Sequence, residues 1–387
     1  MKIIAAPDSF KGSRTSSEVA SDIERGIRKV YPEARIVKIP IADGGEGTVD
    51  AAVLGGQGEY REIDAKGPLG GRVRARYGVL KGNRAVIEMA AASGLPLVPE
   101  GRRNPLLTTT YGTGELIRTA LEEGCREFLI GIGGSATNDA GMGMAQALGY
   151  SFRDGDGKEL GFGGGELGKL AEIDASKADP RLKGSRFIVA CDVTNPLYGE
   201  KGAARIYGPQ KGATPEMVRI LDQNLRHFAS IVESQLGIVV SDVPGSGAAG
   251  GLGAGLMIFC GAELASGIDA MLNMVGFDAH LEGTDLVITG EGRMDGQSIY
   301  GKAPIGIASR AAKHDIPVVA IVGDIGENAE IVFSHGIHSI MSSASGAMTL
   351  REAMDNASTL IESASERAMR LIGIGLKMAK HGTLEKG

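Results

Sequence analysis

The strongest constraint on the fold is a repeated alternation of short apolar runs and amphipathic helical patterns near both ends of the chain. Residues 2–6 form an apolar run, and apolar side chains then recur at helical spacing from Val19 to Val30. The run RIVKIPIA at residues 35–42 repeats this order, with a helix expected over residues 49–54. Strand, loop and helix in repeated succession predict a largely parallel sheet with helices packed on it.

The same order returns late in the chain, whereas the middle of the chain is different. Apolar runs between residues 285 and 343 alternate with helical patterns, but the strand-like segments before them are interrupted by glycine-rich loops. We therefore expect an α/β protein with two α/β domains. One domain would combine residues 1–75 and 285–387, and residues 76–284 would form an inserted second domain. Two consecutive domains are the alternative.

Composition narrows the class of protein. A length of 387 residues favours two hydrophobic cores, and a formal net charge of −6 argues against a nucleic-acid partner, which requires excess Lys and Arg. The three cysteines, Cys125, Cys191 and Cys260, are far apart and form neither a disulfide framework nor a zinc motif. The sequence has no apolar run typical of a signal peptide or a membrane span. We expect a soluble, cytoplasmic protein without a membrane partner.

Glycine is unusually frequent in this sequence. The chain has 60 glycines in 387 residues, about twice the usual share of roughly 7%. Many glycines fall in three clusters, at residues 133–143, 161–168 and 245–255. Apolar periodic segments flank these clusters, which therefore indicate functional loops and not low complexity. Glycine-rich loops allow the backbone to approach a ligand closely.

The loop PDSFKGS follows the first predicted strand and carries Asp8, Ser9 and Lys11. Open α/β sheets bind their ligands at the carboxyl ends of strands, so these side chains are candidate ligand contacts, with Lys11 suited to a phosphate. The alternative is that Ser13 or Thr15 simply caps the next helix, and for Thr15 we favour capping.

The loop ADGGEGT has the same place after the second strand and carries Asp43 and Glu46. Carboxylate oxygens are the ligands that Mg²⁺ prefers, so the two residues form a candidate magnesium site. Equally, Asp43 would cap the next helix and Glu46 would favour its dipole.

The loop GIGGSATNDAG, residues 131–141, directly follows the strand-like segment EFLI and is a candidate phosphate cradle. Its first residues also satisfy G-x-G-x-x-A, the dinucleotide fingerprint, with Asp154 as a possible ribose ligand. GSGAAG at Gly245 fits a similar pattern, but Asp269 lies in a stretch that is expected to be helical, so this second match is discounted.

The segment ITGEGRMDGQSIYGKA supplies Glu291, Arg293, Asp295 and Lys302 after a late strand. Ala303 stands where a P-loop requires Ser or Thr, so a P-loop is rejected. The remaining charges predict an ionic site in which Arg293 grips a carboxylate or phosphate. A surface salt-bridge cluster is the alternative.

The segment CDVTNPLYG places Asp192 and Asn195 after the strand RFIVA, where a carboxylate accepts a proton from a substrate hydroxyl. An ordinary turn at Asn195-Pro196 is the alternative. The nearby segment YGPQKGAT adds Lys211. The histidines form no metal-binding constellation.

These segments together resemble the bacterial glycerate kinase family, from Met1 to about Gly323 and in the same order. The motifs that carry the resemblance are APDSFKGS, IADGGEGTVDA, EMAAASGL, NPLLTTTYGTGEL, GIGGSATNDAG, CDVTNPLYG, GPQKGA, GAAGGLGAGL and ITGEGRMD. The resemblance implies ATP-dependent phosphorylation of D-glycerate, with 2-phosphoglycerate favoured over 3-phosphoglycerate. It also implies a flavodoxin-like domain formed from both chain ends and an inserted second domain.

Under this hypothesis each candidate residue receives a role. Asp192 is the expected base, with Lys11 and Arg293 stabilising charge during Mg²⁺-assisted transfer in an interdomain cleft. Asp43 and Glu46 are expected to bind Mg²⁺. The residues expected to bind glycerate are Asp8, Ser9, Asn195, Glu291 and Lys302. Those expected to bind ATP are Gly133, Gly134, Ser135, Thr137, Asn138, Asp139, Lys211, Gly247 and Gly250.

Two other classes of function remain open at this stage. The fingerprint at Gly131 with Asp154 would fit an NAD(P)-dependent oxidoreductase of a small hydroxy acid. A non-catalytic sensor of small acids is the other alternative. The sequence leaves the choice between a monomer and a homodimer open.

Overall fold

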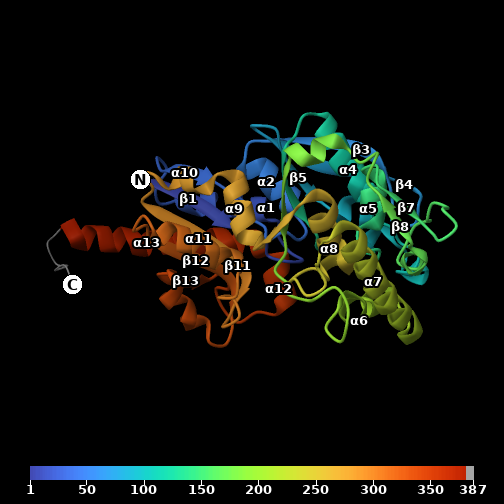
Figure 1. Ribbon diagram of the computed structural model, residues 1–387. Coiled ribbons are helices and arrows are strands. Elements are labelled where there is room, and N and C mark those ends of the chain that lie inside the picture. The colour runs from blue at the N-terminus through green and yellow to red at the C-terminus, as the bar shows by residue number, and fades with distance from the viewer. Residues whose placement is uncertain (381–387) are drawn as a thin grey trace. The chain divides into compact units, whose positions relative to one another are not determined.

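The computed structural model describes residues 1–380 and divides into two compact units. The first unit combines Met1–Asp43 and Asp50–Gly56 with the chain from Leu272 onward, and the second combines Gly44–Val49 with Gln57–Met271. Both the blue amino-terminal segment and the red helix α13 therefore belong to the first unit (Figure 1).

The first unit contains a five-stranded sheet with the order β13-β12-β11-β1-β2, in which every neighbouring pair is parallel. Its strands are β1 Lys2–Pro7, β2 Arg35–Lys38, β11 Leu286–Met294, β12 Val318–Ile325 and β13 Ser339–Ser342. Pro7 at the end of β1 lies opposite Gly290 of β11. The residues that follow these two, Asp8 and Glu291, are thereby placed at the same edge of the sheet.

Helices of the first unit pack on this sheet through alternate strand residues. Ile3 and Ala5 of β1 share a core cluster with Ile23 of α1 and Ile361 of α13. Thr15 accepts a hydrogen bond from the Glu18 amide in a capping box, which confirms the capping role expected of Thr15. The helical elements are α1 Ser16–Arg28, α2 Thr48–Gly55, α9 Gly267–Val275, α10 Phe277–Leu281, α11 Ala303–Ala312, the 3₁₀ helix η6 Ala329–His335, α12 Leu350–Asp355 and α13 Ala357–Lys380. Of these, α2 and α9 each cross the border between the two units.

The second unit contains a mixed six-stranded sheet with the order β10-β9-β6-β5-β4-β3. β5, β6, β9 and β10 pair in parallel, whereas β3, β4 and β5 form antiparallel pairs. The strands are β3 Glu59–Lys66, β4 Arg72–Leu80, β5 Arg84–Glu88, β6 Glu127–Gly131, β9 Arg186–Ala190 and β10 Glu263–Ala265. β7 Ser151–Arg153 and β8 Glu172–Asp174 form a separate antiparallel pair.

The second unit has its own core, in which Phe128 of β6 stacks on Phe187 of β9 with ring centroids 4.5 Å apart. Its helical elements are α3 Ala90–Ser93, η1 Leu95–Leu97, η2 Glu100–Arg102, α4 Tyr111–Glu122, α5 Met142–Ala147, η3 Glu166–Lys169, η4 Pro180–Gly184, α6 Ala203–Tyr207, η5 Pro209–Lys211, α7 Pro215–Leu236 and α8 Ala248–Cys260.

The predicted fold class, α/β with a parallel sheet and two α/β parts, is confirmed. The compact units have different bounds from the predicted domains, because β3 and β4 pair with β5 in the second unit. The domain boundaries near residues 75 and 285 stay a prediction. Among residues 1–380, no helix combines the length and apolarity that crossing a membrane requires.

Candidate functional site

Three carboxylates gather at the carboxyl edge of the first unit's sheet, and we call Asp8, Asp43 and Glu291 the acid cluster. Asp8 directly follows β1, and its amide donates a 2.8 Å hydrogen bond to the carbonyl of Gly290. The pKa of Asp8 is raised to about 7, first by burial and then by the charges of Asp43 and Glu291, although a 2.6 Å hydrogen bond from the Ser9 amide acts in the opposite direction. Asp8 therefore exchanges its proton near neutral pH.

Glu291 is tied to the loop that follows β11. Its side chain is buried and accepts a 2.7 Å hydrogen bond from the Ser298 hydroxyl. Lys302 Nζ lies 3.3 Å from the Glu291 carboxylate and donates to the Ser298 hydroxyl at 3.2 Å. Burial raises the pKa of Glu291, and Ser298 and Lys302 counteract this rise. The structure thus brings Asp8, predicted from the loop after β1, close to Glu291 and Lys302, which were predicted from the segment at residues 288–303.

Arg293 does not point into this group. Its guanidinium lies 3.6 Å from Asp295 and 3.5 Å from Asp324, and 61% of its side chain is exposed. This arrangement matches the surface salt-bridge alternative. Exposed ion pairs of this kind contribute little to stability, about 0–1 kcal/mol.

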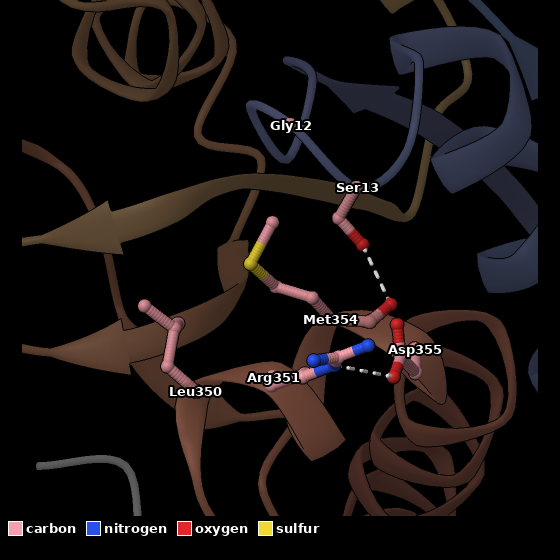
Figure 2. A pocket seen from close by; sticks show the side chains of 6 residues that line it. All are labelled: Gly12, Ser13, Leu350, Arg351, Met354 and Asp355. Carbon is pink, nitrogen blue, oxygen red and sulfur yellow. Dashed lines mark hydrogen bonds and ion pairs between the residues drawn. The ribbon is translucent and has the colours of Figure 1, made fainter.

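The loop that carries Lys11 is fixed on its far side by α12. Ser13 Oγ donates a 2.9 Å hydrogen bond to the carbonyl of Met354 (Figure 2). A cavity of about 510 Å³ lies between the two segments and is lined by Gly12, Ser13, Leu350, Arg351, Met354 and Asp355. Lys11 itself is exposed, so its side chain is accessible to a phosphate group of a ligand.

In the second unit, two predicted loops meet at the carboxyl edge of the parallel strands. A side chain at Gly131 would come 2.5 Å from the carbonyl oxygen of Gly44, and one at Gly133 would come 3.2 Å from the Cα of Gly45. We call these four residues, Gly44, Gly45, Gly131 and Gly133, the glycine edge. Only glycine permits two backbones to approach this closely. Gly133 and the next residue, Gly134, are exposed beside this contact.

The rest of this loop turns inward, so the side chains of Thr137, Asn138 and Asp139 are fully buried. Asp139 accepts hydrogen bonds from the amide and the hydroxyl of Thr110 at 2.8 and 2.9 Å. Burial raises the pKa of Asp139, and these bonds counteract it. The predicted contact of these three side chains with ATP stays a prediction, while Ser135 is 8% exposed and lies nearer the surface.

Lys211 lies under the same loop. Only 1% of the residue is exposed, and its Nζ donates a 2.7 Å hydrogen bond to the carbonyl of Thr137. Burial lowers the pKa of Lys211 to about 7, although the charge of Asp139 acts in the opposite direction.

Gly247 and Gly250 lie where the backbone at the start of α8 packs closely against neighbouring loops. A side chain at Gly250, which has a φ of +71°, would collide with the carbonyl oxygen of Thr137. A side chain at Gly247 would collide with the carbonyl oxygen of Pro196. These glycines therefore allow α8 to approach two loops.

Asp192 and Asn195 have structural partners. Asp192 Oδ1 accepts a 3.0 Å hydrogen bond from the amide of Gly267, the first residue of α9. Asn195 donates to the carbonyl of Lys201 at 2.8 Å and accepts from the Tyr207 hydroxyl at 2.6 Å. The bonds of Asn195 match the turn alternative, and Asp192 stabilises the start of a helix.

The candidate magnesium ligands, Asp43 and Glu46, are both exposed. Helix α2 begins only at Thr48, so Asp43 does not cap it, and the Val49 amide instead donates to Glu88 at 2.7 Å. Within residues 1–380, no three Asp, Glu, His or Cys side chains are close enough to enclose a metal ion. Mg²⁺ in kinases is commonly held by one or two carboxylates together with substrate phosphates, and two exposed carboxylates such as Asp43 and Glu46 fit that chemistry.

The dinucleotide-binding alternative lacks its required acid. Asp154 follows β7, which belongs to the small two-stranded sheet and not to the sheet that contains β6. Its carboxylate accepts hydrogen bonds from the amides of Asp156 and Lys158 at 3.0 and 2.9 Å. The fingerprint requires an acid at the end of the neighbouring parallel strand, so Asp154 does not meet the requirement.

Sequence reasoning missed Glu88, Thr110 and Ser298, each of which holds a loop of the candidate sites. Glu88 is the last residue of β5, so the rule that strand ends position functional side chains would have found it. Thr110 and Ser298 act by hydrogen bonds to Asp139 and Glu291. No local sequence signal marks these two contacts.

Comparison with known proteins shows first that this α/β chain is an enzyme, a kinase. Glycerate 2-kinase of Escherichia coli (strain K12) is 51% identical over 380 residues, which cover 98% of this chain and 100% of that protein. Glycerate kinase of Halalkalibacterium halodurans is 53% identical over 365 residues, or 94% of this chain and 96% of the relative. A crystal structure of a chain assigned as glycerate kinase 2 in Salmonella typhimurium LT2 matches with a TM-score of 0.89 and 47% identity, covering 97% of this chain and 99% of that chain.

The family follows from the same comparison. The model of the glycerate kinase family matches residues 3–373. The chain therefore belongs to the glycerate kinase family, and the resemblance inferred from its motifs is confirmed.

Replacing Asp8 by Asn should stabilise the fold in a pH-dependent manner. The pKa of Asp8 is about 7 in the folded state against an ordinary 3.8, so the folded state binds the proton more tightly and the free energy of unfolding falls as pH rises between these values. Asp8→Asn carries no charge and should therefore raise this free energy by about 1–3 kcal/mol at pH 8, with the gain shrinking towards zero below pH 4. Urea unfolding at both pH values measures the difference.

Asp324→Asn is the matched control, because Asp324 is an exposed carboxylate beside Arg293. It should change stability by less than about 0.5 kcal/mol at either pH. An equal response of the two variants, or a loss of stability for Asp8→Asn at pH 8, would contradict the burial argument.

Proposed function

We propose that this enzyme phosphorylates the 2-hydroxyl of D-glycerate with ATP and Mg²⁺, and yields 2-phosphoglycerate. The observation that carries the choice of hydroxyl is the 51% identity, over 98% of the chain, with a protein described as a glycerate 2-kinase. The acid cluster beside Lys302 supports the chemistry, since phosphoryl transfer requires positioning and local charge more than covalent catalysis.

The first unit is proposed to handle the hydroxy acid. Ser9 lies near the end of β1 beside Asp8, and Lys302 at the start of α11 lies beside Glu291. There a cation and a hydroxyl can bind a substrate carboxylate and hydroxyl. Asp43 and Glu46 are proposed to hold Mg²⁺, which when bound neutralises charge on the phosphates of ATP. Lys11 is proposed to stabilise the transferred phosphoryl group, and Arg293 requires release from Asp295 and Asp324 to do the same.

Two carboxylates compete for the role of proton acceptor. Asp192 was expected from the sequence, but its Oδ1 accepts the Gly267 amide at a helix start. Asp8 directly follows β1 and lies near Glu291. Its pKa of about 7 suits a general base at neutral pH. We propose that Asp8 takes the proton as the glycerate oxygen bonds to the γ-phosphorus and the bond to ADP breaks.

The backbone of Gly133, Gly134 and Ser135 is proposed to hold the ATP phosphates. This segment follows β6 at a parallel strand end and exposes two glycines, Gly133 of the glycine edge and Gly134 next to it. Backbone amides at such loops bind phosphates without side-chain charge. Closure of the two predicted domains over the reactants, the cytoplasmic location and the oligomeric state stay predictions.

The direct test of this proposal is ADP release from Mg-ATP with D-glycerate, compared with L-glycerate and with no acceptor. We expect turnover that depends on D-glycerate, and phosphorus NMR should identify 2-phosphoglycerate by its coupling to the C2 proton. Coupling to the two C3 protons would instead identify 3-phosphoglycerate and overturn the choice of hydroxyl. ADP release without any glycerate dependence would contradict the proposed substrate.

Asp8→Asn and Asp192→Asn separate the two candidate bases. Loss of a general base typically costs about 10²–10⁴ in rate, so Asp8→Asn should lower kcat by a factor in this range, whereas Asp192→Asn should lower it by less than about tenfold. Calorimetric titration with D-glycerate should show that both variants still bind the acceptor. The reverse order of the two rates would restore Asp192 as the base.

A further inference from the structure

Lys211 is a buried cationic side chain that the described mechanism leaves unused. Transfer of a lysine ammonium from water into a protein interior is unfavourable, and such groups persist in folds only where they are paired or hydrogen-bonded. Lys211 is 1% exposed, and its Nζ donates to the carbonyl of Thr137 at 2.7 Å. Its bond is thus to the backbone of the loop proposed to bind ATP.

In the described part of the chain, the side chains of Thr137 and Asn138 do not anchor the loop by hydrogen bonds. Thr137 Oγ1, Asn138 Oδ1 and Asn138 Nδ2 are buried without a hydrogen-bond partner among the described residues. The backbone is held instead, by Lys211 at the Thr137 carbonyl and by Thr108, whose hydroxyl donates to the Ala136 carbonyl at 2.7 Å. The two bonds fix consecutive carbonyl groups.

The fixed carbonyls are close in sequence to the exposed turn. Gly134 has a φ of +69°, and its carbonyl accepts the amide of Leu95 at 2.8 Å. Ser135 is the only residue between Gly134 and Ala136, so a shift at Ala136 or Thr137 is transmitted to the turn. The hydrogen bonds from Lys211 and Thr108 therefore restrain the backbone next to the exposed glycines of this turn.

We infer that Lys211 is a positioning residue of the nucleotide site, which fixes the backbone of Gly133–Ser135 through the Thr137 carbonyl and does not contact the nucleotide itself. The inference rests on the proposed binding of ATP phosphates by this backbone. It replaces the direct contact between Lys211 and ATP that the sequence predicts. Thr108 has the same role from the neighbouring carbonyl.

Lys211→Met tests the inference in the full-length enzyme, because methionine is unbranched and of similar length but cannot donate a hydrogen bond. The KM for Mg-ATP should rise at least about tenfold, while the KM for D-glycerate changes less than about twofold. Thr108→Val should shift the KM for Mg-ATP in the same direction, and it provides a second measurement if Lys211→Met does not fold. Unchanged KM values for Mg-ATP in the folded variants would overturn the inference.

A structural control separates positioning from general loss of stability. Phe152→Leu reduces a fully buried side chain in the core of the second unit, and it should lower the melting temperature without raising the KM for Mg-ATP. If it raises this KM as much as Lys211→Met does at a similar melting temperature, the positioning role is wrong. A crystal structure with a non-hydrolysable ATP analogue in which Lys211 Nζ bonds a phosphate oxygen would also overturn it.

Gly134→Ala distinguishes failure of the inference from failure of the proposed function. An alanine at a φ of +69° is strained, although its Cβ would meet Ala90 only at an ordinary 3.5 Å. A raised KM for Mg-ATP in Gly134→Ala alone would keep the loop as the nucleotide site and reject the role of Lys211. No change in Gly134→Ala, Lys211→Met and Thr108→Val would show that the loop does not bind the nucleotide.

Discussion

Parallel pairing of β1 with β11 is the interaction on which the proposed chemistry depends. The register that sets Pro7 opposite Gly290 also brings the next residues, Asp8 and Glu291, to one edge of the sheet. Burial at this edge is the largest cause of the raised pKa of Asp8, and the charges of Asp43 and Glu291 add to it, so the charged form of Asp8 is unfavourable for the fold. Packing of Ile3 and its neighbours against α1 and α13 stabilises the strands that impose this arrangement.

In the second unit, glycine residues allow backbone segments to pack closely at the edge of the sheet. Its parallel strands β6 and β9 end beneath the segment that carries Gly44 and Gly45, and the backbone contacts at the glycine edge leave no space for side chains. The loop after β6 then buries Asp139 and receives the buried Lys211. Rigidity therefore comes from groups below the loop, while the exposed turn at Gly134 presents backbone only. Both units use the carboxyl ends of parallel strands, where α/β proteins commonly bind ligands.

Much of the fold was predictable, because hydrophobic periodicity reports burial directly. Alternating apolar runs and helical patterns located the strands and helices of the first unit, and the motifs identified the family. The antiparallel pairing of β3 and β4 was not predicted, because it brings these strands into the second unit by contacts that no local pattern encodes. The gathering of Asp8 and Glu291 followed from their places near the carboxyl ends of neighbouring parallel strands, whereas Lys302 reaches Glu291 from the start of α11. The bond between Asp192 and Gly267 did not, since it joins residues that are 75 positions apart.

The pH dependence of kcat/KM for D-glycerate tests the central claim, that the strand-end carboxylate Asp8 accepts the proton, most directly. This ratio reports the ionisation of essential groups in the free enzyme. Because the pKa of Asp8 is about 7 and the base must be deprotonated, kcat/KM should rise about tenfold per pH unit below pH 7 and level off above it. If the enzyme stays folded and kcat/KM is constant between pH 5.5 and pH 8.5, the account is contradicted.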